Sequence, residues 1–277
     1  MTWHASLHLN YRHDGERTTA LDRHEGPLRV LQRLYPEGPA ICHHVLVHPP
    51  GGVVGGDVLS LHATLQPGSH ALITTPGATR FYRSAGELAE QRVSARLEPG
   101  TRLEWLPMET IAYNDCLAQN HLQFDLASGA EMIGWDVLAL GLPAAGKAFE
   151  KGRFLQHLAL PGVWLDRGLI DAADTHLLDS PLGWAGRRVL ATLWFAGGDA
   201  LAAPRHEALL ESARRLIDGD AVLSNHGGAT LLQDRVVVLR ALAPSVEPAM
   251  QLLARVWAAW RGIAWGLGAT PPRLWRT

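Results

Sequence analysis

Residues 35–57 read YPEGPAICHHVLVHPPGGVVGGD, and residues 72–84 read LITTPGATRFYRS. The first stretch is a polar strand with Cys42, His43, His44 and His48, and it runs through two prolines into two glycine pairs that end on Asp57. Proline and glycine together allow a tight turn with unusual backbone dihedrals. The stretch therefore predicts a strand that enters a sharp turn, around which soft and hard metal ligands gather.

The alternation of apolar and polar residues continues through most of the first 200 residues. Period-2 alternation is typical of strands with one buried face. The clearest alternating segments are 6–12, 41–48, 58–66, 70–75, 92–98, 101–106, 121–127 and 153–160. Turn signals separate them at Pro67-Gly68, Pro99-Gly100, Ser128-Gly129 and Pro161-Gly162. The first 200 residues are therefore expected to be mainly strands.

Three of these turns share the form L-x-[PS]-G, and Gly162 is a looser fourth copy. The glycines at 68, 100 and 129 are 32 and 29 residues apart. Spacings of roughly 20–50 residues are typical of stacked repeat units. We therefore predict a mainly β fold with two stacked sheets in an irregular, solenoid-like coil rather than a closed barrel. Ordinary hairpins that share turn chemistry are the alternative.

Two helices are predicted after residue 200. Pro204 can occupy the first turn of a helix that runs to about Asp218, and Ser245 can cap a second helix. The segment LLQDRVVVLRALA, residues 231–243, predicts a buried strand between them. No low-complexity linker divides the chain. Residues 1–277 are thus expected to form one domain, with strands in 1–200 and two helices with an intervening strand in 201–277.

Composition excludes several classes of protein. A hydrophobic content of 47% with 19% charged residues is typical of a globular chain, and a formal charge of −2 gives no field that would hold nucleic acid. The two cysteines lack C-x-x-C spacing, which argues against a disulfide framework and favours a reducing compartment. The N-terminus lacks the apolar core of a signal peptide, and no window is long and apolar enough to cross a bilayer. We therefore expect a cytoplasmic protein without a membrane partner.

Metal binding is the chemistry that the histidine-rich strand allows. Cys42 and His44 lie on the same strand face, roughly 6.5–7 Å apart along the strand, so they could bind one ion together. A structural zinc site needs four such ligands, and they are not arrayed here. Half-exposed strand histidines without a metal are the alternative.

Catalytic and nucleotide motifs are missing from the sequence. The glycine pairs match neither G-x-G-x-x-G nor the phosphate-binding loop, and no G-x-S-x-G elbow occurs. Carboxylates are available at Asp57, Glu104, Glu109, Asp115 and Asp136, but sequence does not bring any two together. No catalytic residues are therefore assigned.

Five blocks in order carry a resemblance to a known family: YPEG, CHHVLVHPPGGVVGGD, LITTPGATRFYRS, LEWLPME and the ending PPRLWRT. The chain resembles the UreD (UreH) family of urease accessory proteins from near Trp3 to Thr277. The resemblance implies a β-rich scaffold of two stacked sheets that is not an enzyme. It also implies that UreF-type and UreG-type partners join it on the urease apoprotein, and that the complex helps to deliver nickel. Ni²⁺ would bind only in transit, with no tightly bound cofactor, and an internal channel has been proposed for the family.

One loop departs from the family pattern. Residues 141–147 read GLPAAGK, where the family usually reads G-R-x-A-x-G-E. Leu142 and Lys147 therefore replace the usual Arg and Glu, so the ion pair between those positions cannot form.

The resemblance and the ligand chemistry lead to a hypothesis about nickel transit. A carrier must release its cargo, and a full set of imidazole and thiolate ligands would trap Ni²⁺. We therefore expect Asp57, Glu104 and Glu109 to lie along a polar path, with His43 or His48 near its entrance. Cys42 is a further possible ligand.

The C-terminal region is the predicted partner surface. The residues assigned to it are Trp257, Trp260, Trp265, Arg273 and Trp275. Whether the tryptophans are core or interface stays open at this point. Two other functions also stay open: a metal-dependent hydrolase on a β-solenoid scaffold, and an interaction module with no role in metal handling.

Overall fold

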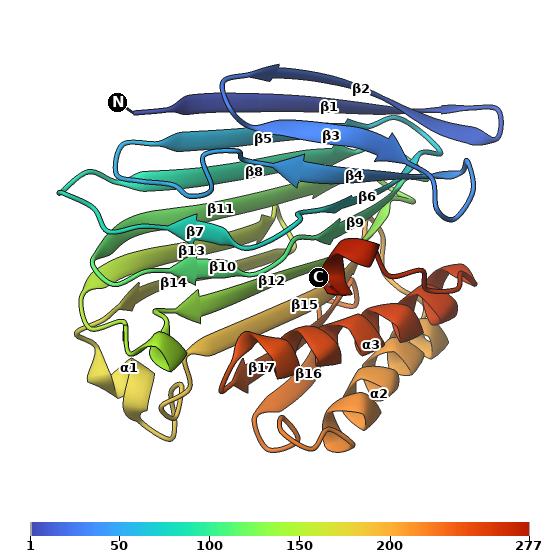
Figure 1. Cartoon of the computed structure of the whole chain (residues 1–277). Helices are drawn as coiled ribbons and strands as arrows, with labels where there is room; N and C mark the ends of the chain where they lie inside the picture. The colour runs from blue at the N-terminus through green and yellow to red at the C-terminus, as the bar shows by residue number, and fades with distance from the viewer. Residues whose placement is uncertain (1, 277) are drawn as a thin grey trace.

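The alternating segments form strands, and the chain winds them into a coil of two sheets (Figure 1). The structure is a computed structural model that describes residues 2–276. One sheet has seven strands in the order β14 (Trp164–Asp171), β13 (Gly152–Leu160), β11 (Cys116–Leu126), β8 (Ala89–Leu97), β5 (Val58–Leu65), β1 (His4–Asp14) and β2 (Arg17–Glu25).

The other sheet has ten strands. Its main order is β16 (Gly227–Leu232), β17 (Val236–Ala243), β15 (Val189–Gly197), β12 (Glu131–Leu140), β9 (Arg102–Leu106), β6 (His70–Thr74), β4 (Ile41–Val47) and β3 (Arg29–Leu34). Two short strands, β10 (Thr110–Ala112) and β7 (Thr79–Phe81), continue from β12.

Successive turns of the coil stack in parallel. β5, β8 and β11 each pass through an L-x-[PS]-G turn into β6, β9 and β12 of the other sheet, and strands in the same sheet pair in parallel register. The turn glycines have φ of 77°, 70° and 73°, a left-handed conformation that favours glycine. The predicted solenoid-like coil is confirmed. The turn at Gly162 differs, because it joins β13 to β14 as an antiparallel hairpin within one sheet.

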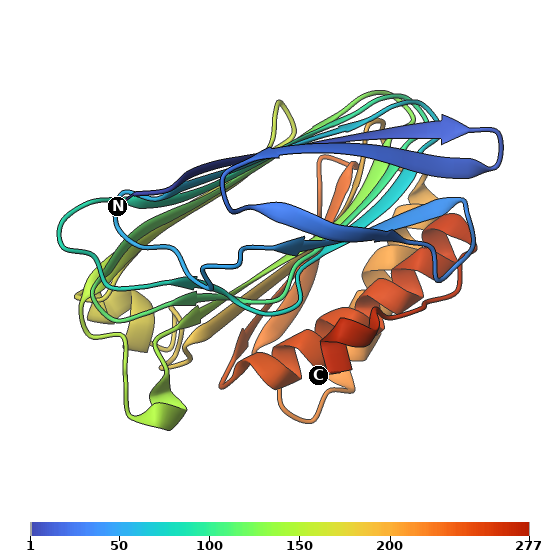
Figure 2. The same cartoon turned by 45° about the horizontal axis from the view of Figure 1, so that its top comes forward.

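The ten-stranded sheet lies between the seven-stranded sheet and two helices, α2 (Ala203–Asp218) and α3 (Val246–Trp265) (Figure 2). One apolar cluster fills the space between the sheets, and a second lies under the helices. Strands of the seven-stranded sheet therefore alternate between buried and exposed residues, whereas every residue of β12 after Glu131 is buried. Alternation consequently predicts five strands of the seven-stranded sheet (β1, β5, β8, β11 and β13) and three of the other (β4, β6 and β9), and it misses β12 and β15.

Both C-terminal helices begin where the sequence predicts, and α2 ends at the expected Asp218. Ser245 occupies the N-cap position of α3, but its side chain makes no capping hydrogen bond. The buried strand expected at 231–243 is confirmed for Val236–Ala243, which form β17, but it does not run unbroken. Gln233 and Asp234 adopt φ of 48° and 51° and turn the chain into a hairpin, so residues 231–232 belong to β16. A short helix, α1 (Thr175–Asp179), was not predicted, and the Asp174 side chain caps it by accepting from the Leu177 N–H. Two 3-10 turns lie at Pro143–Ala145 and Arg273–Arg276. Within residues 2–276, no helix has the length and apolarity needed to cross a membrane.

Candidate functional site

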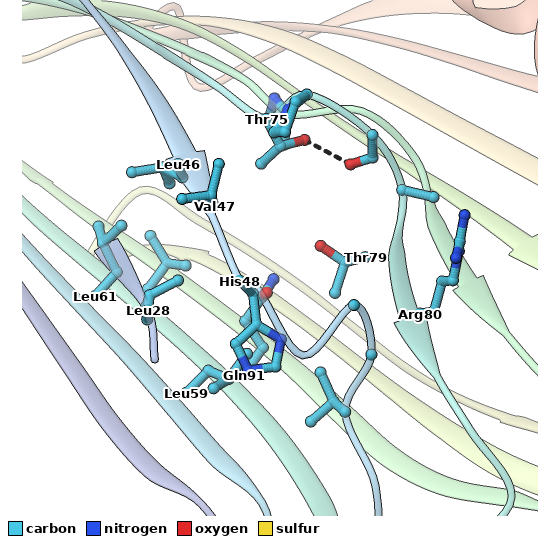
Figure 3. Close-up of a pocket in the computed structure, with 18 of the residues that line it drawn as sticks. Leu28, Leu46, Val47, His48, Leu59, Leu61, Thr75, Thr79, Arg80 and Gln91 are labelled. Carbon is cyan, nitrogen blue, oxygen red and sulfur yellow. Dashed lines mark hydrogen bonds between the residues drawn. The ribbon is translucent and has the colours of Figure 1, made fainter. Parts of the chain in front are cut away.

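A cavity of about 240 Å³ lies between the two sheets, beside the glycine-rich turn (Figure 3). Most of its wall is apolar, and its polar lining comes from His48, Thr75, Thr79, Arg80, Gln91 and Arg92. His48 directly follows β4, so the strand end delivers its imidazole to the cavity. Gly52 is required in the turn, because a Cβ at this position would lie 2.0 Å from the Tyr82 ring.

A row of polar side chains begins at this cavity and crosses the apolar interior. Gln91, Asn120 and Gln156 occupy the same register on β8, β11 and β13. Gln91 Nε2 donates to Asn120 Oδ1 at 3.0 Å. Asn120 Nδ2 and Gln156 Nε2 then donate to the two carboxylate oxygens of Asp136, at 3.0 and 3.1 Å. Asp136 belongs to β12, so the row joins the two sheets, and Gln91 is common to the row and the cavity.

Burial changes the protonation of two groups in this interior. It raises the pKa of Asp136 to about 7, against the opposing hydrogen bond from Asn120. It lowers the pKa of His48, against the opposing charge of Asp57. The His48 imidazole is therefore neutral at pH 7, and its Nε2 atom is buried without a hydrogen-bond partner. A single neutral imidazole nitrogen and amide oxygens bind a divalent cation weakly, so the bound cation can leave again.

A second polar cluster lies on the other face of the ten-stranded sheet, under α3. Glu104 is completely buried there, and its Oε1 lies 2.8 Å from His70 Nε2. Glu104 Oε2 accepts from Trp257 Nε1 at 2.6 Å and lies 3.2 Å from Arg261 Nε. Arg261 Nε makes no hydrogen bond, so this contact is an ion pair only.

Arg261 extends the cluster to the β3–β4 loop. Its Nη1 donates to Glu37 Oε2 at 2.8 Å and to the Gly268 carbonyl at 2.5 Å. Glu37 Oε1 in turn lies 2.8 Å from His43 Nε2. Burial alone would raise the pKa of Glu37, but the hydrogen bonds from His43 and Arg261 outweigh it and lower that pKa. The cluster therefore fastens α3 to the sheet through charged groups.

The six predicted metal ligands do not converge in the structure. Asp57 accepts the backbone N–H groups of Trp3 and Val54 at 2.7 and 3.0 Å, and so fixes the glycine-rich turn. Burial raises the pKa of the Cys42 thiol. Glu104 and His43 belong to the cluster under α3, and Glu109 lines a surface groove beside that helix.

His48 is the predicted ligand that lines the cavity between the sheets. Across residues 2–276, no group of three or more His, Cys, Asp or Glu side chains is placed to hold a metal ion. A role in nickel transit stays a prediction for all six residues.

The predicted partner surface divides into core and surface residues. Trp257 and Trp260 are fully buried, and Trp265 is 8% exposed. Arg273 is exposed, and Trp275 is half-buried with its Nε1 donating to Thr74 Oγ1 at 3.0 Å. The three helix tryptophans therefore pack within this chain, and partner binding by any of the five stays a prediction.

The polar row was missed by sequence reasoning, although a signal for it exists. Gln91 and Asn120 each lie nine residues before a turn glycine, at Gly100 and Gly129 respectively. An equal distance from the turn gives equal register in stacked strands. Comparing the repeats position by position would have aligned the two amides on one face.

The loop at 141–147, where the sequence departs from the expected pattern, closes through backbone hydrogen bonds. The Leu142 N–H donates to the Lys147 carbonyl at 2.6 Å, and the Lys147 N–H donates back at 3.1 Å. Backbone hydrogen bonds thus join Leu142 and Lys147, the two positions at which an Arg and a Glu were expected.

The two-sheet coil with a polar row through its interior defines a β-solenoid scaffold protein. A family model described as UreD urease accessory protein matches residues 4–276. The chain is also 65% identical to the urease accessory protein UreD of Leptothrix cholodnii over 100% of both chains. It is 59% identical to that of Variovorax paradoxus over 100% of both chains, and 58% identical to that of Albidiferax ferrireducens over 99% of both.

The chain therefore belongs to the UreD urease accessory protein family. This membership confirms the resemblance found in the sequence and assigns the chain to urease maturation as a non-catalytic accessory protein. It sets aside the alternative of a metal-dependent hydrolase. It also implies that the chain interacts with the urease maturation machinery.

Proposed function

We propose that this chain is a cytoplasmic scaffold that lends its polar interior to Ni²⁺ on the way to the active centre of urease. UreF-type and UreG-type accessory proteins and the urease apoprotein would be its partners. The observation that carries the proposal is the polar row of Gln91, Asn120, Gln156 and Asp136, which starts at the cavity that His48 lines.

The energetics of burial support a functional reason for this row. Burying polar groups costs free energy even when they are hydrogen-bonded, and an apolar core of the same shape is often as stable. A row of amides through a mainly apolar core is therefore an expensive way to stabilise the fold. A path for a hydrated or partly hydrated cation needs such oxygen atoms.

The ligand set fits transit better than storage. Nickel is held tightly by several imidazole or thiolate ligands together. The cavity and the row offer one neutral imidazole, amide oxygens and a single carboxylate, whose affinity rises when Asp136 is deprotonated. We assign His48 to the entrance of the nickel path. The negative charge of Asp57 acts on His48 and partly opposes the lowering of its pKa.

The proposal is tested by making the row apolar without changing the surface. Asn120→Leu removes the amide that connects Gln91 to Asp136, and Gln123→Leu is the matched control on the outer, half-buried face of the same strand. Each variant is co-expressed with apo-urease and the accessory proteins, and nickel per urease active site is measured together with complex assembly.

We expect Asn120→Leu to assemble the complex but to lower nickel loading severalfold, while Gln123→Leu loads normally. Full loading by Asn120→Leu, with the complex intact, would refute the path. That result would favour the interaction module without a metal role.

A further inference from the structure

A surface groove of about 980 Å³ lies outside the two sheets (Figure 1 shows the helices that flank it). It is lined by the first half of α3, the turn at 219–222 that follows α2, residues 108–109 after β9, and Pro271 and Trp275 near the C-terminus. We call it the α3 groove. None of the residues of the polar row lines it.

Part of the lining of the α3 groove is apolar, and we call this part its floor. Met108, Val222, Met250 and Trp275 contribute to it, and Val222 is 45% exposed. Methionine side chains adapt their shape to an incoming surface. Exposed apolar grooves of this kind receive the apolar face of an amphipathic helix. The floor therefore suits a helix that presents side chains at i, i+3, i+4 and i+7.

The charged residues of the lining, which we call its rim, are mostly acidic. Asp220 pairs with Arg255, so these two charges cancel. Glu109 and Glu247 remain without a cationic partner among the described ion pairs, and Glu247 accepts only from Gln251 Nε2 at 3.2 Å. Two uncompensated carboxylates beside an apolar floor complement Lys or Arg beside an apolar helix face.

The same charges argue against a second copy of this chain. A two-fold interface places the same patch on both subunits, so the two acidic rims would face each other. Like charges brought together in an interface are unfavourable. The acidic rim disfavours nucleic acid for the same reason.

We propose that the α3 groove binds an amphipathic helix of a partner protein whose apolar face is flanked by Lys or Arg. The proposal deepens the proposed function, because this helix belongs to a protein of the urease maturation machinery. Trp275 forms part of the floor, where it also packs against Trp135 and Trp257 with ring centroids 4.9 and 5.3 Å apart. The chain's own C-terminal segment is thus fixed as one wall of the groove.

Two substitutions test the groove with the full-length chain. Val222→Glu adds a charge to the floor at an exposed position, and Glu247→Lys reverses the rim. Leu169→Glu is the matched control, because Leu169 is 54% exposed on β14 of the seven-stranded sheet, away from the groove. Affinity for the purified accessory partners is measured at low and high salt, and circular dichroism checks folding.

We expect Val222→Glu and Glu247→Lys each to weaken binding at least tenfold, with a smaller salt dependence for Glu247→Lys. Leu169→Glu should bind like the unsubstituted chain. Binding within twofold of the unsubstituted chain by both groove variants would overturn the proposal. It would leave the nickel path intact, because that path is tested by nickel loading of Asn120→Leu.

Crosslinking identifies the occupant. A photoreactive benzoylphenylalanine placed at Val222 in the reconstituted accessory complex is irradiated, and the joined peptide is sequenced by mass spectrometry. We expect a helical segment with apolar residues at helical spacing and flanking Lys or Arg. A crosslink to a second copy of this chain, or to an acidic segment, would overturn the proposal, as would the absence of any crosslink in an assembled complex.

Discussion

The buried pair of Arg261 and Glu104 offers a sharp test of how α3 is held. Arg261→Met keeps most of the side-chain stem and removes the guanidinium. The carboxylates of Glu37 and Glu104, which the guanidinium contacts at 2.8 and 3.2 Å, are then left without their cation under the helix. Removing one partner of a buried ion pair costs about 3–5 kcal/mol, because the remaining charge is buried and uncompensated.

The magnitude can be separated from side-chain packing by a double-mutant cycle. Glu104→Gln keeps a hydrogen-bond acceptor for Trp257 and leaves Arg261 paired with Glu37, so we expect a loss of about 1–3 kcal/mol. The double variant removes both charges at once and should lose less than the sum of the single variants, with a coupling of about 1–3 kcal/mol. Arg255→Met is the control on the same helix, where the arginine is 46% exposed and pairs with Asp220; such exposed pairs contribute about 1 kcal/mol or less.

Urea unfolding followed by tryptophan fluorescence measures these free energies, because Trp257 donates directly to Glu104. The reasoning is refuted if Arg261→Met and Arg255→Met lose the same stability, or if the effects of Arg261→Met and Glu104→Gln simply add. The result also affects how functional data are interpreted. A Glu104 variant that lowers urease activation must first be corrected for the unfolded fraction before nickel transit is invoked.

Three further predictions concern the interior. Asp136 has a pKa of about 7 in the folded chain against an ordinary value of 3.8, so between these pH values the native state binds a proton that the unfolded state has lost. The free energy of unfolding should therefore fall by up to about 4 kcal/mol as pH rises through this window. Asp136→Asn should remove this pH dependence from the urea midpoints. Burial lowers the pKa of His44 from 6.5 to about 4, so stability should fall by up to about 3 kcal/mol as pH drops through that window, and an unchanged acid limb in His44→Gln would contradict this. Gly52→Ala should cost about 1–3 kcal/mol, because the added methyl group overpacks against Tyr82. Gly77→Ala, in the loop between β6 and β7, meets no atom within 4 Å and should melt near the unsubstituted chain; equal melting temperatures of the two variants would count against the close approach at Gly52.

The parts of the fold that sequence predicted are those that depend on neighbours along the chain. Alternation identified β1, β5, β8, β11 and β13, because one face of their sheet meets water. It also predicted β4, β6 and β9 of the ten-stranded sheet, where polar residues interrupt the apolar ones. It missed β12 and β15, because both faces of these strands are buried and their sequences are almost continuously apolar. The hairpin turn at Gln233 and Asp234 was missed for a different reason: Gln-Asp is a weaker turn signal than Asn-Gly or Asp-Gly.

In the candidate site, too, the sequence predicted what short segments determine and missed the contacts between distant residues. The motifs placed His48 beside a turn and identified the family, and both conclusions follow from short contiguous segments. They did not show that Glu104 is buried against Trp257, which is 153 residues away. They also did not show that Gln91 and Asn120 meet Asp136 across the gap between the sheets.

The sequence by itself determined the repeated turns, the buried faces of most strands of the seven-stranded sheet, and the membership of an accessory family. Turn preference, period-2 burial and family motifs are all properties of contiguous residues. Only the tertiary structure decided which polar side chains are locked in ion pairs under α3 and which line the interior. The physical reason is that winding the coil stacks strands from different repeats, and the packing of α3 buries charges that are far apart along the chain.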